Sequence, residues 1–134
     1  MADDALFRGM EISATGLNAE WLRMHVVANN LANAETTRTP EGGPYQRQQV
    51  VFSTVLNDLQ GVTVKGITTG DGGVRLVYNP LHPDADDEGF VAMPNVTVPT
   101  EMLDMLTASR AYEANLVCMR RFKQICEDAI GLLK

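Results

Sequence analysis

The sequence has few cysteines, no long apolar run and no excess of positive charge. Its two cysteines, Cys118 and Cys126, fall in one predicted helix, where eight residues of helix separate them by about 12 Å. That distance excludes a disulfide between them within one chain, and neither has the spacing of a metal-ligand set. No uncharged apolar run approaches the ~18 to 20 residues that a membrane-spanning helix needs.

Basic residues are also scarce: 11 Lys and Arg stand against 17 Asp and Glu, which gives a net charge of -6. Without a basic run to neutralise phosphates, we expect no nucleic-acid partner. The first ten residues hold two aspartates and one arginine, so they lack the basic and apolar regions of a cleavable secretion signal. We therefore expect no cleaved signal peptide.

The 134 residues, 45% apolar and 21% charged, suffice for one compact domain or one elongated unit with a small appendage. Between residues 3 and 33, apolar side chains recur at alternating spacings of four and three, which predicts a helix with a heptad seam. It should stop near Asn33, because weak helix formers and breakers follow. The seam residues are Met10, Ala14, Leu17, Trp21, Met24, Ala28 and Leu31.

A second helix is predicted from an N-cap at Thr100, with Glu101 and Asp104 in its first turn, to Leu133. It carries two apolar stripes, and one partner helix cannot cover both. The first stripe comprises Met102, Met105, Ser109, Tyr112, Leu116, Met119, Lys123, Cys126, Ile130 and Leu133. The second comprises Cys118, Phe122, Ile125, Ala129 and Leu132.

Between the helices, short β-prone runs at 49–52, 62–67, 74–78 and 90–98 are separated by glycine- and proline-rich turns. We therefore predict an α+β fold. The terminal helices, 1–33 and 100–134, form a helical core packed as a coiled-coil-like hairpin. Residues 34–99 form a small inserted antiparallel β-rich region with extended loops.

The acidic loop at residues 82–88 is the one cluster that could bind a hard cation, but it lacks a full calcium-loop pattern and suits a solvated connection. His25 has no carboxylate or thiol four residues away to orient it, and no nucleophile or phosphate-binding motif is present. We expect no enzyme activity, no cofactor, no metal and no small-molecule substrate.

Apolar surface left over by a two-helix hairpin favours an obligate oligomer or a structural polymer over a monomeric binding module. Two alternatives remain. A soluble coiled-coil adaptor would form a discrete dimer or tetramer, whereas a metal-dependent enzyme would use the acidic loop.

Short strings in both halves of the chain carry a family resemblance. The strings ANNLANA at 28–34, TT at 36–37 and TPEGGPY at 39–45 resemble the N-terminal motif of the bacterial flagellar rod and hook family. In the second half, HPDAD at 82–86, GFV at 89–91, PNV at 94–96 and ASRAYEAN at 108–115 follow the same family in order. Together the two halves resemble its proximal-rod branch.

The resemblance implies a structural subunit of the basal-body proximal rod, in a helical tube that carries torque from the MS ring to the distal rod and hook. The implied partners are copies of itself, other rod subunits, and the side of the basal body that holds the MS ring and export gate. It also implies export by the flagellar type III apparatus without a cleaved signal peptide.

Two sets of residues are expected to matter for this role. Asn29, Asn30 and Asn33 should tie the end of the first helix to the inserted region or to a neighbouring subunit, because helix ends leave backbone groups without partners. The residues expected to pack in the core or between subunits are Met10, Leu17, Trp21, Met24, Leu31, Met105, Tyr112, Leu116, Met119, Phe122, Ile125 and Ile130.

Overall fold

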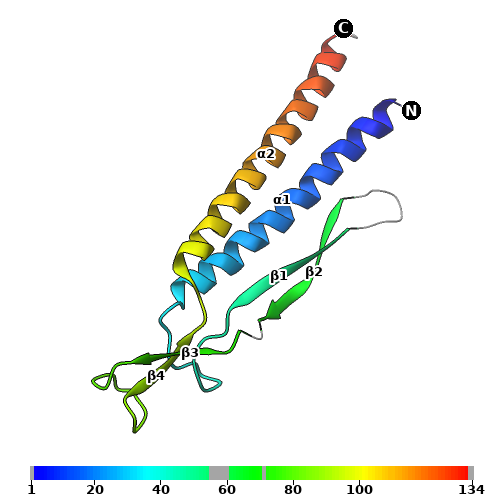
Figure 1. Ribbon diagram of the computed structural model, residues 1–134. Coiled ribbons are helices and arrows are strands. Elements are labelled where there is room, and N and C mark those ends of the chain that lie inside the picture. Colours follow the sequence, from blue (N-terminus) through cyan, green and yellow to red (C-terminus); the bar gives the residue numbers. More distant parts are fainter. Residues whose placement is uncertain (1, 55–60, 71, 133–134) are drawn as a thin grey trace.

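Two long helices flank a β-rich insertion, which confirms the predicted α+β fold (Figure 1). The structure is a computed structural model and describes residues 2–54, 61–70 and 72–132. In chain order the elements are α1 (Ala2–Ala32), β1 (Gln48–Thr54), β2 (Val62–Thr69), β3 (Val74–Tyr78), β4 (Phe90–Pro94) and α2 (Val98–Gly131).

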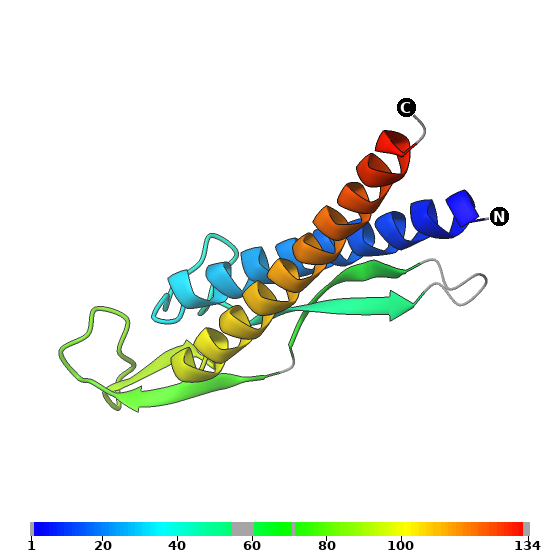
Figure 2. The same cartoon turned by 90° about the horizontal axis from the view of Figure 1, so that it is seen from above.

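The helices α1 and α2 form an antiparallel hairpin, with both chain ends at the same end of the molecule (Figures 1 and 2). Glycines on α1 allow the close approach. A Cβ atom added to Gly9 would lie 2.6 Å from the ring of Phe122, and one added to Gly16 would lie 2.8 Å from the amide of Asn115. In the last turn of α1, Asn30 meets Glu101 of α2.

The seam of α1 against α2 lies one residue earlier than the sequence predicts. Gly9, Gly16, Arg23 and Asn30 make the contacts with α2, seven residues apart, and the buried residues Ser13 and Val27 fall in the same heptad. The predicted apolar heptad begins at position 10, so it is turned by about 100° around the helix. Its members are half-buried except for the exposed Trp21 and Ala28.

The boundary between β4 and α2 also differs from the prediction. Strand β4 ends at Pro94 instead of residue 98, and α2 begins at Val98 with Thr97, not Thr100, at the N-cap. Pro99 is tolerated because the first turn of a helix does not use its backbone N–H groups for intrahelical bonds. The predicted helix end at Leu133 lies outside the described residues.

The strands form two separate antiparallel sheets of two strands each, β1 with β2 and β3 with β4. The first sheet, which we call the arm, lies beside α1 in both views (Figures 1 and 2). The first residue of β2 is fixed to α1, because the Thr15 hydroxyl accepts a hydrogen bond from the backbone N–H of Val62 at 3.2 Å. The second sheet lies at the end of the molecule opposite the chain ends (Figure 1).

The small core sits where the two helices meet the inserted region. Its buried apolar residues are Ala19, Val26, Val27, Ala34, Val91, Val96 and Ala108. Neither helix, over its described residues, is both long and apolar enough to cross a bilayer.

Candidate functional site

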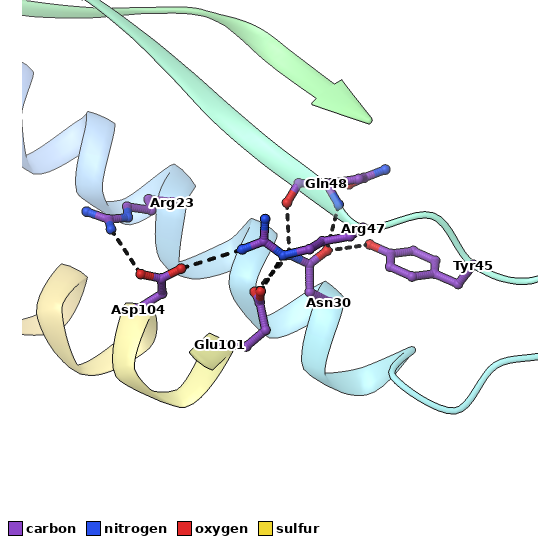
Figure 3. A network of polar contacts seen from close by, with 7 residues as sticks. All are labelled: Arg23, Asn30, Tyr45, Arg47, Gln48, Glu101 and Asp104. Carbon is purple, nitrogen blue, oxygen red and sulfur yellow. Dashed lines mark hydrogen bonds and ion pairs between the residues drawn. The ribbon is translucent and has the colours of Figure 1, made fainter. Parts of the chain in front are cut away.

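A buried polar network joins the end of α1, the start of β1 and the first turns of α2 (Figure 3). We call it the junction. At its centre Glu101 is 0% exposed and Asn30 is 1% exposed. Burying a carboxylate and an amide so completely is unfavourable unless each finds hydrogen-bonding partners, so the contacts of these two residues determine what the junction does.

Asn30 makes four hydrogen bonds, the full capacity of an amide side chain when each group is used twice. Its amide nitrogen donates to the backbone carbonyl of Gln48 at 2.8 Å and to a carboxylate oxygen of Glu101 at 2.9 Å. Its amide oxygen accepts from the backbone N–H of Gln48 at 2.9 Å and from the Tyr45 hydroxyl at 3.0 Å. One side chain therefore connects three segments that are far apart in the sequence.

Glu101 also binds Arg47, whose Nε donates to the second carboxylate oxygen at 2.5 Å. The other end of the Arg47 guanidinium lies 3.6 Å from Asp104, and Asp104 in turn contacts Arg23 of α1 at 3.4 Å. Two arginines thus alternate with two carboxylates across the junction (Figure 3). The alternating charges offset the cost of burying the Glu101 carboxylate, whereas Arg23 and Asp104 stay 32% and 34% exposed.

Tyr45 shows the effect of this environment on ionisation. Burial raises the pKa of its hydroxyl above 10.0, and the nearby negative charge of Glu101 raises the pKa further. The hydroxyl therefore stays protonated and able to donate to Asn30. The junction holds no activated nucleophile; its chemistry is that of a structural connection.

The three asparagines of the sequence motif take different roles. Asn30 lies in the junction, whereas Asn33 donates to the backbone carbonyl of Asn29 at 2.9 Å and accepts from Thr36 at 3.2 Å, which secures the helix end locally. Asn29 is exposed and contributes that carbonyl. Sequence analysis did not identify the burial of Glu101 or its pairing with Arg47, because a carboxylate in the first turn of a helix is ordinarily a favourable surface residue.

In the acidic loop, two carboxylates are used to fold the loop itself. Asp84 accepts from the Thr37 hydroxyl at 2.8 Å, and Asp86 accepts from the backbone N–H groups of Glu88 and Phe90 at 3.0 and 2.7 Å. Among the described residues, no three His, Cys, Asp or Glu side chains are grouped so as to hold a metal ion.

The residues expected to pack fall into two groups. Trp21, Ile125 and Ile130 are exposed in the single chain. The others are half-buried: Met10, Leu17, Met24, Leu31, Met105, Tyr112, Leu116, Met119 and Phe122.

Helix α2 carries a further apolar stripe on the side away from α1, which we call the outward face. At about 100° per residue, its members fall within about 100° of one another and are centred roughly 120° around the helix from the positions that meet α1. Of the second stripe predicted from the sequence, Phe122 instead packs against Gly9, while Ile125 and Leu132 belong to the outward face. The exposed apolar residues of this face are Leu103, Leu106, Ala114, Val117, Ile125 and Leu132.

Comparisons with known proteins match both ends of the chain to flagellar families. Residues 10–38 match the family described as flagella basal body rod protein, and residues 87–132 match the flagellar basal body rod FlgEFG protein C-terminal family. The first match covers most of α1 and the asparagine motif. The second covers β4 and the described length of α2.

Curated relatives extend the match over nearly the whole chain. The flagellar basal-body rod protein FlgC of Borreliella burgdorferi is 38% identical, covering 96% of this chain and 98% of that protein. FlgC of Bacillus subtilis is 38% identical, with the same two coverages, and FlgC of Aquifex aeolicus is 41% identical over 91% of this chain and 92% of that protein. The chain therefore belongs to the FlgC family of flagellar basal-body rod proteins.

Proposed function

We propose that this chain, a structural subunit of the flagellar basal-body rod and not an enzyme, builds a helical tube from its terminal helices. In this proposal the tube carries torque from the MS ring towards the distal rod and hook. The helical segments 1–33 and 100–134 form the core of the assembly, and the inserted region 34–99 packs outside it. The observation that carries the proposal is the apolar surface that the hairpin leaves uncovered.

That surface has two parts, one on each helix. On α1, the apolar heptad beginning at Met10 lies beside the seam rather than in it, and Trp21 within it is 51% exposed. On α2, the outward face points away from α1 over most of the helix length. Long apolar stripes of this kind are unfavourable in water, and neighbouring subunits can cover both.

The junction suits a subunit that transmits force. Because Asn30, Arg47 and Glu101 hold the two helices and the arm together through fully paired buried groups, the elements cannot slide past one another without leaving polar groups unpaired. A subunit built in this way passes a load from its helices to its outer region. Packing of many such subunits side by side then makes the tube stiff.

Family membership gives the partners of the chain in general terms, and we propose the specific ones. As a FlgC family member in the basal body, the chain assembles with other components of the rod. At the finer level, we place it among copies of itself, on the side of the rod that faces the MS ring and export gate, and delivered by the flagellar type III export apparatus.

Substitutions on the uncovered surface test the proposal in a motile strain. Leu17→Asp on the α1 heptad and Val117→Asp on the outward face should abolish swimming and remove rods from isolated basal bodies. Val117 is 53% exposed, so Val117→Asp should leave the melting temperature of the purified chain nearly unchanged. Thr68→Asp, at an exposed position on β2, is the matched control and should swim.

The alternative of a soluble adaptor predicts a different result. An adaptor forms a closed dimer or tetramer, whereas a tube requires contacts between unlike surfaces that continue from subunit to subunit. Normal basal-body rods in cells carrying Val117→Asp would contradict the proposed tube. Discrete dimers of the purified chain that Leu17→Asp dissociates would favour the adaptor.

A further inference from the structure

The sheet formed by β3 and β4, which we call the distal hairpin, presents an apolar face that the described residues leave largely uncovered along β3. Val74, Leu76 and Tyr78 alternate along β3 and so share one face, where they are 52%, 63% and 65% exposed. Phe90 lies opposite Tyr78 in the register and meets its ring edge-on, with the ring centroids 5.4 Å apart. Leu81, in the connecting loop, is 95% exposed.

Two negative charges border the apolar face without partners. Asp87 and Glu88 are exposed in the loop that joins β3 to β4, and neither carboxylate makes a hydrogen bond or ion pair with a described residue. Their neighbours Asp84 and Asp86 differ, because those carboxylates hold the loop together. The distal hairpin therefore combines an apolar face with two unpaired acidic groups at its tip.

The outward face of α2 has complementary features. Arg110 and Arg121 lie on it, exposed and without an ion pair to any described residue, and between them lie the apolar residues Ala114 and Val117. Eleven residues of helix place the two arginines about 16 Å apart.

These two surfaces cannot meet within one chain. No contact joins α2 to β3 or β4, and the distal hairpin lies at the end of the molecule away from the chain ends (Figure 1). The partner of the distal hairpin must therefore be another molecule. A second copy supplies the required chemistry, namely an apolar stripe flanked by unpaired arginines.

We propose that the distal hairpin of one copy docks on the outward face of α2 of the next copy, with Asp87 and Glu88 reaching Arg110 or Arg121. The contact joins two different surfaces, so each copy can bind one neighbour through its hairpin and another through its α2. It therefore propagates and does not close into a dimer. This inference rests on the proposed function, in which copies of the chain assemble side by side.

Cross-linking between two tagged chains tests the contact directly. One chain carries Leu81→Cys together with Cys118→Ala and Cys126→Ala, and the other carries only Cys126→Ala, so that it keeps the exposed Cys118 on α2. When they are mixed under oxidising conditions, disulfide-linked heterodimers should exceed both homodimers. Heterodimers no more abundant than the homodimers would overturn the proposal.

Charge reversal then identifies the groups responsible. Arg110→Glu with Arg121→Glu should lower the heterodimer yield about tenfold, because Asp87 and Glu88 then meet a negative charge at whichever of the two positions they reach. Adding Asp87→Arg and Glu88→Arg to the partner chain should restore the yield. The matched control is Arg120→Glu, since residue 120 is exposed but lies about 100° away from residue 121 around the helix and should change little.

The same variants separate this contact from the rod function itself. In a motile strain, the double arginine reversal should reduce swimming, and the four-residue charge exchange should restore it. If the arginine reversal stops swimming and the exchange does not rescue it, the docking proposal fails while the rod role stands. If neither the reversal nor Val117→Asp affects swimming, the proposed helical tube fails as well.

Discussion

At the scale of single residues, Asn30 is the side chain on which most of the structure depends. Its four hydrogen bonds satisfy two backbone groups of Gln48, the Tyr45 hydroxyl and the Glu101 carboxylate. A leucine of similar size would fill the space but leave all these partners unpaired. The residue is therefore required for its amide group and not for its volume.

We expect Asn30→Leu to lower the free energy of unfolding by about 3 kcal/mol, since buried groups that lose their partners cost about 1 to 3 kcal/mol each and some relax towards water. Urea denaturation followed by circular dichroism measures this change. Asn33→Leu is the control, because Asn33 bonds only within its own helix end, and it should cost clearly less. Equal losses for the two variants would contradict the central role of Asn30.

The ionisation of Tyr45 gives a prediction for alkaline pH. Its folded-state pKa is raised above the ordinary 10.0, so the folded protein holds the phenolic proton more tightly than the unfolded chain does. The stability that this proton contributes is fully present below pH 10.0 and is lost as the pH rises through the folded-state pKa. Tyr45→Phe should therefore show a shallower loss of stability above that pH.

Melting temperatures of both proteins, measured at a series of pH values, test this expectation. Near neutral pH, Tyr45→Phe should cost about 1 kcal/mol through the lost hydrogen bond to Asn30. Tyr78→Phe, at an exposed tyrosine on β3, is the control and should change the stability near neutral pH little. Parallel alkaline limbs for wild type and Tyr45→Phe would show that Tyr45 titrates alike in the folded and unfolded states.

At the scale of elements, one glycine fixes how the arm lies on α1. Gly61 has a backbone φ of 104°, in the region that favours glycine, and a Cβ there would clash with the Thr15 hydroxyl of α1. That hydroxyl also accepts the hydrogen bond from Val62. The start of β2 is thus held by close contact as well as by hydrogen bonding.

We expect Gly61→Ala to destabilise the protein by about 1 to 3 kcal/mol, through backbone strain and the displaced Thr15 contact. The comparison variant is Gly66→Ala within β2, where an added Cβ meets nothing within 4 Å. That change should be nearly neutral. Thermal unfolding compares the two variants, and an equal cost for both would mean that the arm is not held at Gly61.

The elements were more predictable from the sequence than their packing. Helix α1, strand β3 and the β-rich insertion follow from local patterns, and β3 has the predicted bounds 74–78. The exact start of α2 was missed because Pro99 ended the predicted strand region instead of opening the helix. Such a boundary depends on a proline that is compatible both with the end of a strand and with the first turn of a helix.

The seam and the junction could not be predicted for a different reason. Periodicity selects the most apolar line along a helix, but the line that meets α2 consists largely of glycine and polar residues such as Gly16, Arg23 and Asn30. These residues pack well only because Asn115, Asp104 and Glu101 lie opposite them. The pairing of Gly16 with Asn115 links positions 99 residues apart (115 − 16), and a single sequence does not reveal it.

At the scale of the whole molecule, burial is distributed unevenly along the hairpin. The buried residues Val26, Val27 and Asn30 on α1 and Glu101 and Ala108 on α2 all lie near the junction. Towards the chain ends, Phe7 and Ile130 are at least 60% exposed. Burial is therefore densest at the junction end of the hairpin, although Gly9 still packs on Phe122, and the outermost turns depend on neighbours for burial.

This asymmetry predicts a gradient of local stability in the isolated chain. Amide hydrogen exchange should be slowest around 26–32 and 101–108, and it should become progressively faster along α1 towards Phe7 and along α2 beyond Met119, because those turns bury little apolar surface. Assembly should slow exchange at these outer turns most, since neighbouring helices then cover them. Hydrogen exchange with mass spectrometry on a verified monomer and on assembled rods measures both states. Uniformly slow exchange along both helices of the monomer would mean that the hairpin is stable by itself, and the argument that its uncovered faces require other subunits would lose its physical basis.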